Sequence, residues 1–161
     1  MTIRFIGVDP GKSGAIAAID NYDNVIFIKD LSANYHTYWE IIADCADIVG
    51  SYEDNISVVE DVCGRPGQSC QANTTFMKLA GMAELAAYTI SDMSKVKPQV
   101  WKKYFGLISK GLTKTEKKKM SIELAKKLFP SVADQLTASK DGRAEALLLA
   151  KYCKEVYEDH V

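Results

Sequence analysis

The chain has 161 residues, 47% of them hydrophobic and 25% charged, and its formal net charge at pH 7 is −1. This composition is that of a globular protein, and no apolar run reaches the length of about 18 residues that a membrane-spanning helix needs. The four cysteines form no C-x-x-C pair and no histidine lies near them, which argues against a zinc site and favours reduced, mostly buried thiols of a cytoplasmic protein.

Hydrophobic periodicity and turn residues predict strands and helices within one domain, residues 1–161. The first thirty residues alternate short apolar runs with turns, which predicts an antiparallel meander. The first predicted strand begins at residue 3, so we expect no signal peptide before it. Thr113 and Glu116 have the spacing of a capping box at the start of a helix. The predicted strands span residues 3–9, 15–20, 25–29, 56–62 and 94–97, and the predicted helices span residues 35–49, 72–90, 99–105, 113–128 and 141–157. This order indicates a mixed α/β sheet with helices on its faces.

Four acidic residues are candidates for a metal site. Asp9 ends the first predicted strand and Glu60 lies near the end of the fourth, each after a run of apolar and small residues. A carboxylate buried there costs several kcal/mol unless a cation compensates it. Asp141 and Glu145 are four residues apart in a predicted helix, so both lie on one face. These like charges repel each other, and a divalent cation would reverse that effect.

Each of these acids also fits a structural role. Asp9 precedes Pro-Gly and would suit a turn, Asp141 would suit a helix cap, and Glu60 and Glu145 would suit a solvated strand end and a solvated helix surface. The residues alone leave both interpretations open.

Lysine is concentrated in one segment. Between residues 95 and 127 there are eleven Lys and two Glu, an asymmetry that suits a polyanionic partner. The consecutive lysines 117–119 point in different directions on a helix and would equally suit a solvated surface. The candidates for neutralising a nucleic-acid backbone are Lys12, Arg65, Lys110, Lys114 and Lys118.

Several segments, taken in order, resemble the RuvC family of Holliday junction resolvases. They are Ile6-Gly7-Val8-Asp9-Pro10-Gly11, Val58-Val59-Glu60, residues 73–81, residues 96–102 and Asp141-Gly142-Arg143-Ala144-Glu145-Ala146-Leu147. The last two acids have the spacing Asp-x-x-x-Glu, which resembles the phage and viral branch, whereas the bacterial enzymes carry Asp-x-x-Asp. The loop after Glu60 also lacks the aromatic residue that the bacterial enzymes carry there.

The resemblance implies an RNase H-like fold, with a five-stranded mixed sheet of three antiparallel and then two parallel strands and helices on both faces. It also implies an endonuclease that resolves four-way and other branched DNA in recombination and repair. Asp9, Glu60, Asp141 and Glu145 would hold two Mg²⁺ ions, for which Mn²⁺ would substitute. The resemblance further implies a location in the cytoplasm of a bacterial or phage-infected cell. It also implies a homodimer, formed through the helix 72–90, that cuts the junction symmetrically.

Three alternatives remain. An RNase H-fold nuclease acting on flaps, forks or RNA–DNA hybrids would need the same acids. A DNA-binding relative that has lost catalysis is a further alternative, against which the intact acidic set argues. A phosphotransferase of the sugar-kinase and actin superfamily would also end its first strand with Asp-x-Gly, but it needs two such domains, for which this chain is too short.

Overall fold

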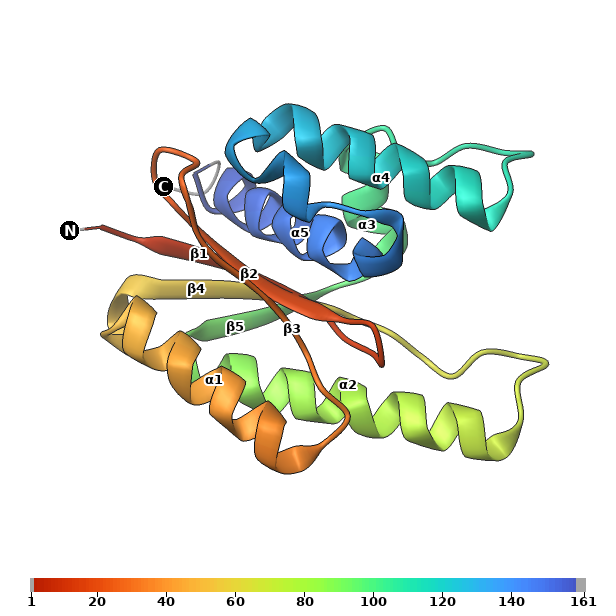
Figure 1. Cartoon of the computed structure of the whole chain (residues 1–161), viewed down its shortest axis with the longest axis horizontal. Helices are drawn as coiled ribbons and strands as arrows, with labels where there is room; N and C mark the ends of the chain where they lie inside the picture. The colour runs from red at the N-terminus through yellow and green to blue at the C-terminus, as the bar shows by residue number, and fades with distance from the viewer. Residues whose placement is uncertain (1, 159–161) are drawn as a thin grey trace.

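The computed structural model of the chain describes residues 2–158 and contains one five-stranded sheet with helices on both faces (Figure 1). The strands are β1 (Arg4–Asp9), β2 (Ala15–Asp20), β3 (Val25–Asp30), β4 (Asn55–Glu60) and β5 (Asp92–Val96). The helices are α1 (Tyr35–Val49), α2 (Cys70–Ile90), α3 (Pro98–Tyr104), α4 (Lys114–Leu128) and α5 (Asp141–Glu158), with short 3-10 helices at Tyr52–Asp54, Pro130–Gln135 and Ala138–Lys140.

The sheet has the strand order β3-β2-β1-β4-β5. β1 pairs antiparallel with β2, and β2 with β3, whereas β1 with β4 and β4 with β5 are parallel pairs. The predicted fold class, three antiparallel strands followed by two parallel ones, is therefore confirmed. The tight turn after β1 and the polar turn after β2 produce the meander, and α1 provides the crossover that a parallel β4 requires.

Each face of the sheet has its own hydrophobic core. α1 and α2 cover one face, and α3, α4 and α5 cover the other (Figure 1). Alternate residues of a strand serve opposite cores: Phe5 packs toward α5, whereas Ile6 packs toward α1 and α2. Among the described residues, no helix is long and apolar enough to cross a membrane.

Side-chain caps fix where the longer helices begin. Thr113 and Glu116 form the predicted capping box at α4, with Glu116 Oε2 2.7 Å from the Thr113 backbone nitrogen. The Ser69 hydroxyl accepts a hydrogen bond from the Ala72 backbone N–H, so α2 begins at Cys70 and not at the predicted residue 72. β4 ends at Glu60, two residues before the predicted end.

The prediction that the cysteines are mostly buried is correct for Cys45 and Cys153 and wrong for Cys63 and Cys70. The two exposed thiols lie around the loop between β4 and α2, which projects away from both cores. All four cysteines are free thiols.

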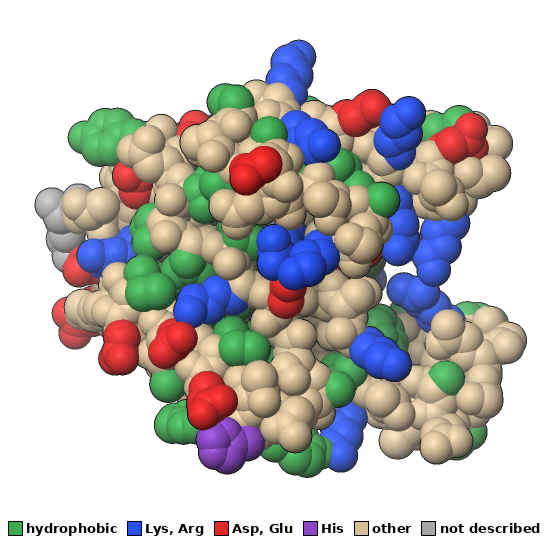
Figure 2. All heavy atoms as spheres, viewed as in Figure 1, with side chains coloured by type: hydrophobic (Ala, Val, Ile, Leu, Met, Phe, Trp, Pro, Cys, Tyr) green, Lys and Arg blue, Asp and Glu red, His purple; other side chains and the backbone are tan. Residues whose placement is uncertain are grey.

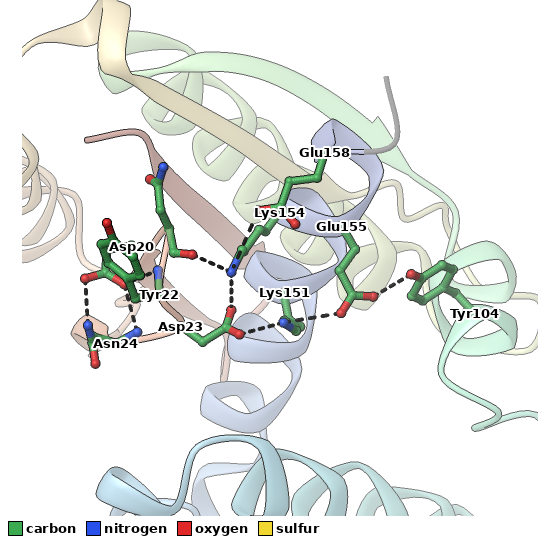
Figure 3. Close-up of polar contacts among 10 residues, drawn as sticks. Asp20, Tyr22, Asp23, Asn24, Tyr104, Lys151, Lys154, Glu155 and Glu158 are labelled. Carbon is green, nitrogen blue, oxygen red and sulfur yellow. Dashed lines mark hydrogen bonds and ion pairs between the residues drawn. The ribbon is translucent and has the colours of Figure 1, made fainter. Parts of the chain in front are cut away.

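The C-terminal half of α5 is tied to the β2–β3 turn by a network of charges (Figure 3). Asp23 Oδ2 lies 2.7 Å from Lys151 Nζ, and Asp23 Oδ1 lies 3.0 Å from Lys154 Nζ. Lys154 also donates to the Asn21 carbonyl, and Lys151 lies 3.3 Å from Glu155. Burial acts to raise the pKa of Asp23, but the hydrogen bonds from Lys151 and Lys154 outweigh that effect and lower the pKa. The network therefore balances each charge with a partner.

Candidate metal centre

Two acidic side chains lie together at the ends of neighbouring strands. Asp9 is the last residue of β1 and Glu60 is the last residue of β4, and the register of this parallel pair brings the two ends side by side. Side chains two apart share a face of the sheet, so Asp9 lies on the face of Phe5 and Glu60 on the face of Val58. Phe5 and Val58 both belong to the core beneath α5, so the two acids lie on the same face of the sheet. The sheet alone therefore directs both carboxylates toward α5.

Two glycines allow α5 to approach these strand ends. A Cβ atom on Gly7 would lie 2.1 Å from a backbone oxygen of α5, and one on Gly142 would lie 2.2 Å from a backbone oxygen of the β1–β2 turn. Such distances are impossible for a side chain, so only glycine permits this direct backbone packing. The first turns of α5 then bring Glu145 and Asp141 to the same place.

Three of the four predicted acids converge. One carboxylate oxygen from each of Asp9, Glu60 and Glu145 lies within 4.8 Å of the other two. Asp141 lines the same cleft, but its carboxylate lies 2.5 Å from Lys118 Nζ in an ion pair. The structure therefore brings together a triad and places the fourth acid at its rim, bound to a lysine.

The triad carries more negative charge than its surroundings balance. Burial raises the pKa of Asp9 well above its ordinary value, and the nearby Glu145 and Glu60 raise it further. Burial and Glu145 also raise the pKa of Glu60. Lys102 Nζ lies 3.1 Å from Glu145 Oε1, but one ammonium does not balance three carboxylates. Burial acts to lower the pKa of Lys102, and the charges of Glu145 and Glu60 outweigh it and raise the value.

This donor set fits a divalent metal ion. Carboxylate oxygens are the ligands that Mg²⁺ and Mn²⁺ prefer, and the repulsion that raises the pKa values of Asp9 and Glu60 would be relieved by a bound cation. Asp9, Glu60 and Glu145 would hold such an ion, and Asp141 would add an oxygen after release from Lys118.

Two further residues contact the triad and were not predicted as site residues. Trp101 is fully buried, and its Nε1 donates a 3.0 Å hydrogen bond to Glu60 Oε1. Lys102 belongs to the lysine-rich segment, but no sequence pattern distinguishes it from its neighbours. Only the packing of α3 against the strand ends reveals both contacts.

A cleft of about 890 Å³ lies above the triad and is lined by basic side chains. The first turns of α2 and α4 project beyond the sheet on the same side of the molecule (Figure 1), and Figure 2 shows Lys and Arg side chains gathered between them. Among the candidates, Lys12, Arg65, Lys114 and Lys118 line this cleft, whereas Lys110 is exposed and is absent from the described lining. The lining also includes Lys97, Lys102 and Lys117.

The loop after Glu60 is anchored to α2. The Arg65 backbone N–H donates to Asn73 Oδ1 at 2.8 Å, and Asn73 Nδ2 donates back to the Arg65 carbonyl at 3.1 Å. The Arg65 guanidinium lies 5.2 Å from the centroid of the Phe76 ring. These contacts hold a basic side chain at the edge of the cleft.

Two solved structures of one bacterial protein have the same fold along nearly their whole length. T. thermophilus RuvC in complex with a Holliday junction substrate aligns with a TM-score of 0.57 at 11% identity, covering 99% of this chain and 96% of that one. The Thermus thermophilus RuvC structure aligns with a TM-score of 0.56 at 14% identity, covering 97% of each chain. The yeast mitochondrial Holliday junction resolvase aligns with a TM-score of 0.46 at 12% identity, over 97% of this chain and 83% of that one.

No protein-family model and no curated protein sequence matches the chain. At these identities the structural alignments establish the fold, which is RNase H-like, and leave activity and substrate to be inferred from the site.

Proposed function

We propose that this protein is a metal-dependent endonuclease that hydrolyses phosphodiester bonds in branched DNA, with four-way junctions as the principal substrate. The observation that carries the proposal is the convergence of Asp9, Glu60 and Glu145 within 4.8 Å, with unbalanced negative charge, at the base of a cleft lined by lysine and arginine. An acidic centre attracts metal cations, and a basic cleft attracts the phosphate backbone. A metal-dependent nuclease uses both features.

The roles of the residues follow from their positions. A pair of bound divalent ions supplies the activation of water and the stabilisation of the leaving oxygen. In this scheme Asp9, Glu60 and Glu145 would hold the ions, and Asp141 would contribute directly or through a water. Lys118, released from Asp141, and Lys114 on the same side of α4 would neutralise backbone phosphates. Lys12 and Arg65 would do so from the loops beside the strand ends.

The choice of branched DNA rests on fold likeness together with the basic lining of the cleft. One structure that aligns over 99% of this chain is of a RuvC protein in complex with a Holliday junction substrate. At 11% identity this is an analogy, and the basic cleft supports it without specifying junctions.

Symmetric cutting of a four-way junction needs two active sites related by a two-fold axis, so we propose a homodimer. α2 carries an exposed apolar stripe, Met77, Gly81, Leu85 and Tyr88, in which the Leu85 side chain is 65% exposed. Sedimentation should show a dimer for the wild-type chain and a monomer for Leu85→Glu. A wild-type monomer at the concentrations that cut junctions would contradict this assembly.

One substrate panel tests the function. A mobile four-way junction, a fork, a flap, a linear duplex and an RNA–DNA hybrid are incubated at fixed salt, with and without Mg²⁺. We expect Mg²⁺-dependent paired nicks in the junction and little cutting of the duplex. Asp9→Asn and Glu60→Gln should abolish cutting and leave junction binding nearly intact.

Asp61→Asn is the matched control, because Asp61 follows Glu60 directly but contacts Lys95 at 3.4 Å and is not part of the triad. It should still cut. Full cutting by Asp9→Asn or Glu60→Gln would end the metal assignment. Cutting of the hybrid or of flaps in preference to the junction would keep the chemistry and replace the substrate, and binding without any cutting would indicate a non-catalytic relative.

A further inference from the structure

Two consecutive residues of the short helix α3 contact two different carboxylates of the triad. Trp101 Nε1 donates to Glu60 Oε1 at 3.0 Å, and Lys102 Nζ lies 3.1 Å from Glu145 Oε1. The Lys102 ammonium also lies 4.9 Å from the centroid of the Trp101 ring. Neighbouring residues of α3 therefore contact both Glu60 and Glu145, and they also contact each other.

The Trp101 side chain has little freedom to move. It is 0% exposed and packs in the core between the sheet and α3, α4 and α5. An indole offers one N–H donor and no acceptor, and a buried one needs a partner. Here that partner is a carboxylate of the candidate metal centre. The buried ring therefore fixes one oxygen of Glu60.

The two contacts differ in their effect on a cation. Lys102 carries a positive charge, so an ion that binds Glu145 must displace it or share the carboxylate with it. The Trp101 N–H is neutral, so it orients Glu60 without opposing a cation. Hydrogen-bond donors that orient metal ligands commonly contribute about 10- to 100-fold to metal affinity.

We propose that Trp101 is a positioning residue of the metal centre, which holds Glu60 through Oε1 so that the second oxygen of Glu60 joins Asp9 and Glu145 in binding a divalent cation. The proposal deepens the proposed function and rests on it in requiring that the triad binds such a cation. It requires no particular DNA substrate.

Trp101→Phe tests the role, because it removes the N–H and keeps an aromatic ring in the core. Mg²⁺ binding is measured by calorimetry near pH 7.5 in the absence of DNA. The expected result is an affinity about 10- to 100-fold weaker than that of the wild-type chain. Phe129→Leu is the matched control, because Phe129 is 1% exposed in the same core. It should lower the melting temperature and leave the Mg²⁺ affinity unchanged.

A second measurement keeps Trp101 in place. The chain has two tryptophans, and Trp39 is 70% exposed on α1. Trp39→Phe leaves Trp101 as the single indole, next to both Glu60 and Lys102. Its fluorescence should change with Mg²⁺ along a saturable curve with the dissociation constant found by calorimetry.

The outcomes separate the two proposals. If the wild-type chain binds neither Mg²⁺ nor Mn²⁺, both proposals fail. If it binds Mg²⁺ and cuts DNA while Trp101→Phe keeps the wild-type affinity, or loses no more than Phe129→Leu does, only the role of Trp101 is overturned. If Trp101→Phe does not fold, the fluorescence decides: a saturable change supports the role, and unchanged emission at Mg²⁺ concentrations that occupy the site overturns it.

Discussion

The two halves of α5 take part in acidic clusters that are in opposite electrostatic situations. At the first turns of the helix, Glu145 meets Asp9 and Glu60, and burial and mutual repulsion raise the pKa values of Asp9 and Glu60. In the C-terminal half, Asp23 meets Lys151 and Lys154, and their hydrogen bonds lower its pKa (Figure 3).

This difference separates a structural network from a candidate binding centre. The charges around Asp23 satisfy one another and stabilise the attachment of α5 to the β2–β3 turn. The carboxylates around Asp9 oppose one another in the folded chain, and a cation from solution would remove that cost. We therefore expect that neutralising an acid changes the metal-free stability in opposite directions in the two regions.

The largest expected effect is on catalysis. Asp9→Asn should lower Mg²⁺-dependent cutting by about 10³-fold or more, which is about 4 kcal/mol of transition-state stabilisation. In EDTA near pH 7.5 the same variant should melt at a higher temperature than the wild-type chain, because it removes one repelling charge. Asp23→Asn should do the reverse, with nearly full cutting and a lower melting temperature. Loss of cutting together with loss of metal-free stability in Asp9→Asn would refute the proposed distinction.

The second effect is on stability. Asp23→Ala leaves Lys154, which is 6% exposed, without its closest acidic partner. We expect the free energy of unfolding to fall by about 2 kcal/mol, which is within the range for a hydrogen bond to a charged group and below that for a broken buried ion pair. Urea denaturation measures it, and Asp92→Ala, at an exposed residue of β5, is the control. An equal loss of unfolding free energy in Asp23→Ala and Asp92→Ala would show that the contacts of Asp23 add no stability of their own.

The third effect is on pH dependence. The raised pKa values of Asp9 and Glu60 mean that the folded chain holds those protons more tightly than the unfolded chain. Their stabilising contribution is complete below the unfolded value of about 4 and is lost as pH rises through the raised values. Asp23 and Asp30, whose pKa values are lowered, contribute above about pH 4 and lose that contribution on acidification.

Melting temperatures measured between pH 5 and 8, in EDTA and in Mg²⁺, test whether the contribution of Asp9 and Glu60 to stability falls as pH rises. The increase in melting temperature produced by Mg²⁺ should grow with pH. When the ion is at 100 times its dissociation constant, the corresponding stabilisation free energy is about 2.7 kcal/mol. In Asp9→Asn the increase should be small at every pH. A wild-type increase that is the same at pH 5 and pH 8 would contradict the raised pKa values of Asp9 and Glu60.

The smallest effect concerns the salt dependence of DNA binding. Lys118→Gln should lower the slope of log affinity against log salt by about 0.9, the value for one lost phosphate contact. Lys127→Gln, on the same helix but exposed outside the described cleft lining, should leave the slope unchanged. Equal slopes for both variants would place the DNA elsewhere than in the cleft.

Much of the fold and part of the site could be predicted because they depend on local patterns. Period-two and helical spacings indicated the strands, the helices and the mixed sheet. Asp9 and Glu60 were identifiable because each ends an apolar strand, and strands of one parallel pair end at the same edge of a sheet. The spacing of Asp141 and Glu145 on one helix face was likewise local information.

The remaining contacts depended on which surfaces pack together. Periodicity gives the face on which a side chain lies and does not identify what lies opposite it. Only the approach of α5 over Gly7 and Gly142 places Glu145 with the strand carboxylates and Asp141 beside Lys118. Only the packing of α3 places Trp101 and Lys102 at the triad, and Lys110 is absent from the described lining of the cleft. The sequence by itself determined the elements and the faces of the acids, and the tertiary structure decided their partners, because long-range packing sets distances that no local pattern records.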